Sequence, residues 1–192
     1  QVNRLAKEVA ARHPRINVLI NNAGLGYGTE RELSADGHEL RFAVMYLAPV
    51  LLTRLLLPRI TEQVLNVGSL GQESLDFGDF KMERSFNGTS AYRRAKLALA
   101  MFTFDLAKLR PDLRVNVVHP ATMMDTNIVR KGGGKVQNTV AHGGDATLRV
   151  LESNLTSTFF NEDKPAQAHA DAYNEELRAE LRAATDKILG ST

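Results

Sequence analysis

Cysteine is absent from the 192-residue sequence, which excludes disulfide bonds, thiolate metal sites and cysteine nucleophiles. Long runs of one charge are also missing. The 24 basic and 22 acidic residues are mixed, and no basic run is longer than Arg93-Arg94. The net charge of +2 and the pI near 9.0 therefore give little support for a nucleic-acid partner.

Targeting and metal-binding signals are equally scarce. The first residues show neither an initiator Met nor a signal-peptide pattern. The most apolar stretch, 42–57, is interrupted by Arg54 and is too short to cross a bilayer. The five histidines are scattered and are interpreted as surface, capping or strand-end residues, so no metal site is predicted. We therefore expect a cytoplasmic protein without a membrane span.

Helical and strand patterns alternate along the chain, which has the apolar content (43%) of one globular domain spanning residues 1–192. This alternation predicts an α/β fold, a parallel sheet covered by helices on both faces. The predicted helices are 3–12, a long helix capped at Ser34 and ending at 57, the helix that carries Tyr92, 145–152 and 166–189. The predicted strands are 16–20, 63–67, 114–119 and 157–160.

Tyr92 and Lys96 lie four residues apart in a helical run, so both side chains share one helix face. A nearby ammonium stabilises a phenolate, which would allow Tyr92 to act as an acid or base. Such a pair alone is more often a surface contact. Asn21-Asn22-Ala23-Gly24, Ser69 and His119-Pro120 each follow a predicted strand, and ligands bind at the carboxyl ends of parallel strands.

These four motifs, in this order, resemble the short-chain dehydrogenase/reductase family, and the Tyr92 segment is similar to the retinol-dehydrogenase-like branch. The resemblance implies a three-layer Rossmann-like fold and an NAD(P)-dependent oxidoreductase that interconverts an alcohol and a carbonyl. Tyr92 would exchange a proton with the substrate oxygen, and Ser69 would donate a hydrogen bond to it. Lys96 would lower the pKa of Tyr92 and bind the nicotinamide ribose.

The resemblance also assigns cofactor contacts. Asn21, Ala23 and Gly24 would line the adenosine side of NAD or NADP, and the segment after Pro120 would meet the nicotinamide carboxamide, with Thr126 as the nearest match. The family's first strands and phosphate-binding glycine loop precede everything in this sequence. We therefore expect a fragment of a longer chain, in which the choice between NAD and NADP is not readable.

Met45 stands where the family carries an asparagine that holds a water in the proton relay, and methionine offers only a weak acceptor. An inactive, truncated relative acting as an interaction module is therefore an alternative. A serine hydrolase is a further alternative, but Val67 occupies the position where a nucleophile elbow needs glycine.

The surroundings of the site give three further expectations. Four apolar side chains would line the substrate pocket, which predicts an apolar alcohol or carbonyl: Met123, Met124, Ile128 and Val129. By analogy with the family, the apolar helix near 47–55 and the Tyr92 helix would pack in a homo-oligomer. The charged residues at 175–180 would form a solvated helix face.

Overall fold

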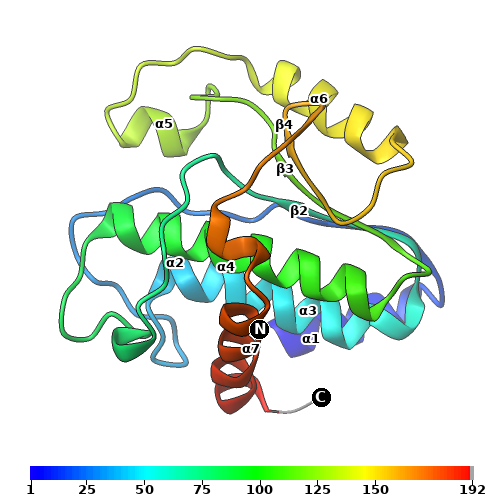
Figure 1. Ribbon diagram of the computed structural model, residues 1–192, viewed down its shortest axis with the longest axis horizontal. Coiled ribbons are helices and arrows are strands. Elements are labelled where there is room, and N and C mark those ends of the chain that lie inside the picture. Colours follow the sequence, from blue (N-terminus) through cyan, green and yellow to red (C-terminus); the bar gives the residue numbers. More distant parts are fainter. Residues whose placement is uncertain (191–192) are drawn as a thin grey trace.

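The computed structural model describes residues 1–190 and contains one five-stranded sheet in the order β1-β2-β3-β4-β5 (Figure 1). The first four strands are parallel, as predicted, and the fifth pairs antiparallel with β4. The short fifth strand was not expected, because Lys-Pro-Ala shows no alternation of apolar and polar residues. The strands are β1 (Ile16–Asn21), β2 (Ile60–Val67), β3 (Arg114–His119), β4 (Thr158–Asn161) and β5 (Lys164–Ala166).

Helices cover both faces of the sheet, which confirms the three-layer prediction. One core cluster packs helical Ala6, Leu56 and Leu106 on strand residues Val64 and Val115, whereas another packs Val150 on the opposite face (Figure 1). The α-helices are α1 (Val2–Arg12), α2 (Leu40–Phe42), α3 (Ala48–Leu56), α4 (Gly88–Leu109), α5 (Asn127–Lys131), α6 (Val140–Glu152) and α7 (Glu175–Leu189). The other helical turns are the π-helical η1 (Ala43–Leu47) and the 3₁₀ turns η2 (Leu57–Arg59), η3 (Phe77–Asp79) and η4 (Ala170–Tyr173).

Three predicted helix starts are wrong, and one of them was placed too late: the helix predicted from 145 begins at Val140, after the Thr139 cap. The Ser34 hydroxyl accepts hydrogen bonds from the amides of Asp36 and His38, so it closes a local turn instead of capping a helix. The helix begins five residues later, where the Glu39 carboxylate accepts the Phe42 amide at 2.8 Å. The last helix is likewise shorter than predicted, because Asn174 caps it at the amides of the next turn.

The continuous helical stretch from Leu40 to Arg59 is 20 residues long, so it starts later than predicted and extends slightly beyond the predicted end at residue 57. By length and composition alone it could span a membrane, and half of its most apolar window is buried inside the protein. Core helices of globular proteins meet the same criterion, so this finding is weak evidence for a membrane span. The stretch supplies core residues including Met45, Tyr46 and Val50.

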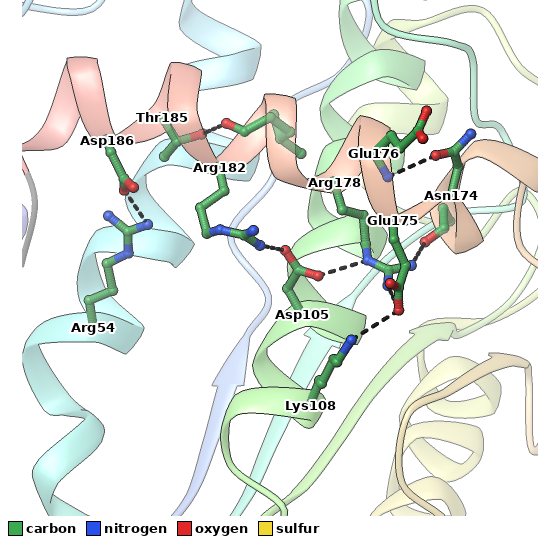
Figure 2. Close-up of polar contacts among 12 residues, drawn as sticks. Arg54, Asp105, Lys108, Asn174, Glu175, Glu176, Arg178, Arg182, Thr185 and Asp186 are labelled. Carbon is green, nitrogen blue, oxygen red and sulfur yellow. Dashed lines mark hydrogen bonds and ion pairs between the residues drawn. The ribbon is translucent and has the colours of Figure 1, made fainter.

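Helix α7 lies against α3 and α4, where ion pairs join the three helices (Figure 2). Asp105 on α4 accepts the Arg178 guanidinium at 2.7 Å and also that of Arg182. Arg178 is buried, so the prediction that this part of α7 is a solvated face is wrong there. Part of the α3 and α4 surface on which a twin subunit was expected is therefore occupied by α7.

Candidate functional site

The ends of β1 and β2 are joined by buried side-chain amides. The Asn21 amide donates to Asn66 Oδ1 at 2.8 Å and to Thr53 Oγ1 at 3.0 Å. The Asn66 amide in turn donates to Thr103 Oγ1 on α4 at 2.9 Å. Asn21 therefore stabilises the sheet and its helix layer, and the backbone that follows it, at 22–24, is exposed. Contact of Asn21, Ala23 and Gly24 with an adenosine stays a prediction.

Tyr92 lies in the first turns of α4, whose start is capped by the Asn87 carboxamide on the Ser90 amide. Burial raises the pKa of Tyr92, a hydrogen bond with the Ser69 hydroxyl lowers it, and the neighbouring Tyr27 raises it. The two hydroxyl groups that the sequence assigned to the substrate oxygen therefore lie near each other, after the end of β2. Ser69 Oγ also accepts the Gly71 amide at 3.1 Å, which fixes its orientation.

Lys96 is 5% exposed, and its ammonium donates to the Val67 carbonyl at 2.7 Å. Burial lowers the pKa of Lys96 to about 8. The ammonium lies 5.7 Å from the centroid of the Tyr92 ring. Burial therefore raises the pKa of Tyr92 in this structure, and the lowering of that pKa by Lys96 stays a prediction.

The segment after β3 approaches the same site. His119 is buried, and its Nε2 lies 3.1 Å from the Thr122 hydroxyl. Burial lowers the pKa of His119, with Glu162 raising it and Lys96 lowering it. Pro120, the next residue, is also buried. Thr126 directly precedes α5, and its hydroxyl donates to the Met124 carbonyl at 3.4 Å. Contact of Pro120 and Thr126 with a nicotinamide stays a prediction.

A cavity of about 450 Å³ lies between the glycine-containing loop 24–28 and α5. Ile128 lines it, but Met123 and Met124 instead pack closely on Gly134 and Gly143. The predicted apolar wall is therefore present only in part. The lining consists of Gly24, Leu25, Gly26, Tyr27, Gly28, Glu32, Leu40, Arg41, Asn127, Ile128, Lys131 and Gly132.

Met45 lies beside this cavity in the π-helical turn η1, a distortion that is frequent at functional sites. It is fully buried, and a side chain at Gly24 would lie 3.8 Å from its sulfur. The position that the family assigns to a polar relay group is therefore filled by an apolar one.

Two residues of this region were missed by sequence reasoning, namely Tyr27 and Arg41. The Tyr27 ring packs edge-on against Tyr92, with 5.0 Å between the ring centroids. Arg41 is buried and donates to the Gly26 and Tyr27 carbonyls. The available signal was a charged residue inside an apolar helical stretch, two positions after Glu39.

Other candidate sites are not supported. Residues 1–190 contain no group of three or more side chains suited to hold a metal ion. A larger cavity of about 550 Å³ lies between α3, α4 and α7, and none of the predicted site residues lines it.

The fold and the strand-end site define a Rossmann-like α/β protein, and comparison with known proteins narrows this class. Residues 1–137 match the family model described as short chain dehydrogenase. The chain belongs to the short-chain dehydrogenase family, as the sequence predicted.

The curated relatives place it near the retinol dehydrogenases. It is 34% identical to human retinol dehydrogenase 14 over 137 residues, which cover 67% of this chain and 40% of that protein. It is 31% identical to the bovine dehydrogenase/reductase SDR family member 12 over 174 residues, covering 80% of this chain and 54% of that protein. The chain therefore spans only about half of the length of these curated relatives.

Solved structures share the fold. A putative uncharacterized protein from Mycobacterium Paratuberculosis is 25% identical, with a TM-score of 0.83 over 99% of this chain and 71% of that chain. The NADPH-bound carbonyl reductase from chicken fatty liver is 23% identical, with a TM-score of 0.63 over 87% of this chain and 72% of that chain. The second likeness is one of fold alone.

Proposed function

We propose that the chain carries the catalytic part of an NAD(P)-dependent oxidoreductase that interconverts an alcohol and a carbonyl. The observation that carries this proposal is that the Tyr92 and Ser69 hydroxyls lie near each other, after the end of β2, with the Lys96 ammonium buried behind them. Membership of the dehydrogenase family supports it.

The segment 22–24 and Lys96 could contact the nucleoside parts of a bound dinucleotide. The exposed backbone at 22–24 follows β1, and Lys96 ends at the Val67 carbonyl of the neighbouring strand. A bound NAD or NADP would supply or accept the hydride. The three glycines of loop 24–28 lack the spacing of a dinucleotide phosphate loop, so the pyrophosphate contacts are not assigned to these residues.

The chain's own groups act on the substrate oxygen. Tyr92 donates a proton to that oxygen in the reducing direction and accepts it in the oxidising direction. Ser69 donates a hydrogen bond and so shares the negative charge that develops there. Lys96 holds positive charge behind the phenol, and its pKa of about 8 keeps most of that charge at neutral pH.

Titration of NADPH and NADH into the 192-residue chain, followed by turnover assays on a panel of carbonyls, tests the proposal. Tyr92→Phe should abolish turnover and leave nicotinamide binding intact, whereas Tyr173→Phe, which alters an exposed phenol outside the site, should change neither. Full turnover by Tyr92→Phe would refute the role of Tyr92. Saturable binding of neither cofactor by the folded chain would contradict the proposal for this chain.

Met45 favours a second candidate, an inactive relative that acts as an interaction module. Its buried thioether cannot hold the water of a proton relay as an amide does. If this candidate is correct, the chain binds nicotinamide without turnover. Turnover that appears only in Met45→Asn would locate the defect at this position.

The remaining features of the proposal follow from the sequence. We also propose that the substrate is an apolar alcohol or carbonyl and that the chain acts in the cytoplasm. It forms a homo-oligomer through surfaces of α3 and α4 that α7 leaves free. Light scattering on the purified chain tests the last point directly.

A further inference from the structure

The Tyr27 side chain stands between the cavity and Tyr92. Tyr27 lines the cavity of about 450 Å³, but Tyr92 does not. The two rings are in contact, 5.0 Å apart between centroids and inclined by 71°. Tyr27 is 42% exposed, whereas burial is the main cause of the raised pKa of Tyr92. A molecule held in the cavity therefore contacts the Tyr27 ring, which in turn packs against Tyr92.

Arg41 fixes the backbone that carries this ring. Its Nε donates to the Gly26 carbonyl at 3.1 Å and to the Tyr27 carbonyl at 2.8 Å. Its Nη1 binds the buried Glu39 carboxylate at 2.9 Å, and its Nη2 lies 3.3 Å from that of Glu32. The planar guanidinium therefore uses its donors on both sides, a pattern that a lysine cannot reproduce.

The loop is also fixed against the helix that carries Tyr92. A side chain at Gly88, the first residue of α4, would lie 1.8 Å from the Gly28 carbonyl oxygen, so the two backbones touch. Gly28 has a φ of +142°, and a side chain there would lie 1.6 Å from Arg41 Nη2. Since the loop backbone is held from two sides, a movement of the Tyr27 ring would have to come from rotation of its side chain.

From this geometry we propose that Tyr27 is an aromatic gate over Tyr92 and that Arg41 is the positioning residue that holds the gate. The inference rests on the proposed role of Tyr92. Substrates that reach Tyr92 from the cavity displace the Tyr27 ring, which favours flat apolar carbonyls that pack on an aromatic face. Tyr27 thus selects substrates by shape, in contact with them, whereas Arg41 acts through the loop.

Nitration by tetranitromethane, followed by mass spectrometry, tests the gate without turnover. This reagent attacks exposed phenolates, and Tyr173, which is also 42% exposed, is an internal reference. Tyr27→Ala should speed nitration of Tyr92 several-fold relative to Tyr173, because it uncovers the ring and removes one cause of its raised pKa. The matched control is Tyr27→Phe, which removes the same cause of the raised pKa but keeps the ring, so Tyr92 should be nitrated much more slowly than in Tyr27→Ala. Equal rates in wild type and Tyr27→Ala would overturn the gate.

Hydrogen exchange tests the role of Arg41. Arg41→Lys keeps a positive charge beside Glu39 but loses the paired carbonyl bonds, so amides of 26–28 should exchange about tenfold faster. The same variant should also accelerate nitration of Tyr92, and circular dichroism confirms that the chain is folded. Unchanged exchange and unchanged nitration in folded Arg41→Lys would overturn the positioning role.

Turnover separates the gate from the proposed function. If the chain is active, Tyr27→Ala should lower KM for bulky carbonyls more than for small ones, with kcat for small carbonyls little changed. A nitration response with no turnover in any variant would refute the proposed function for this chain and keep the gate geometry. Turnover with identical substrate selectivity in wild type and Tyr27→Ala would refute selection by the gate.

Discussion

Two arginine–carboxylate contacts in this chain differ in what surrounds them. Arg41 and Glu39, beside the loop 24–28, have side chains that are 4% and 1% exposed, so this pair has little contact with solvent. Arg178 and Asp105, under α7, are 9% and 21% exposed, and the exposed Arg182 shares the same carboxylate (Figure 2). The first contact fixes a loop beside the candidate site, and the second attaches a helix to the outside of the fold.

Two lysines show the same contrast. Lys96 lies buried at the strand ends, whereas the side chain of Lys108, which pairs with Glu175 of α7, is 70% exposed. The charges of Lys96, Arg41 and Glu39 are therefore largely shielded from water. Loss of a partner from such a buried charge destabilises the fold strongly, and burial also shifts pKa values, as active sites require. Charges at α7 remain hydrated and can be exchanged at little cost.

Removal of the Arg41 side chain should have the largest effect on stability. Arg41→Ala leaves the Glu39 carboxylate buried without its cation, which costs about 3–5 kcal/mol of the free energy of unfolding. Urea denaturation followed by circular dichroism measures it. Arg4→Ala removes an exposed partner of Glu8 and serves as the control, with no expected shift. Similar urea midpoints for Arg41→Ala and Arg4→Ala would contradict the expectation that a buried arginine contributes more to stability than an exposed one.

Lys96 should make stability rise with pH. Its pKa in the folded chain, about 8, lies below its ordinary value of 10.5, so the unfolded chain binds more protons between these values. The stability of wild type should therefore increase by about 1–2 kcal/mol from pH 8 to 9.5, relative to Lys96→Met. Urea midpoints at several pH values measure this difference. Parallel pH profiles for the two proteins would show that Lys96 is not desolvated.

The sequence predicted the sheet because buried parallel strands are short apolar runs that end in small polar or glycine residues. The family resemblance also assigned Ser69 and Tyr92 to one substrate oxygen, and the two side chains lie near each other. Ser69 follows its strand directly, Tyr92 opens the next helix, and the carboxyl ends of parallel strands share one edge. The local sequence pattern was sufficient to predict the position of a residue where its neighbours lie on helices and strands.

The pattern failed where a side chain finds partners on irregular segments. Arg41 and Arg178 both occur in helical stretches in which an arginine is expected to face water, and each is buried by carboxylates and carbonyls from other segments. Tyr27 lies in a loop whose course depends on the contact of Gly28 with α4. The burial that raises the pKa of Tyr92 was not predicted, because spacing on a helix reveals a neighbour but not burial.

A smaller loss is expected at the centre of the α7 contacts. Asp105→Asn removes the charge that holds Arg178 and Arg182, and partial exposure limits the loss to about 1–2 kcal/mol. High salt should reduce the difference from wild type, because ions screen partly exposed pairs. Urea midpoints at low and high NaCl measure both effects. Glu180→Gln alters an exposed carboxylate on α7 for which the described residues show no ion pair, and it should match wild type.

The smallest effect is expected for Lys108→Ala, which removes the exposed partner of Glu175. Lys108 lowers the pKa of Glu175, so any stabilisation by the pair is present above the ordinary pKa of that carboxyl and is lost as the solution is acidified. In water, the attraction is offset by the cost of ordering two long side chains, so the urea midpoint at pH 7 should not move measurably. A loss as large as that of Asp105→Asn would mean that the ion pairs of α7 act as one coupled network, and the contrast between buried and hydrated charges would then not hold for α7.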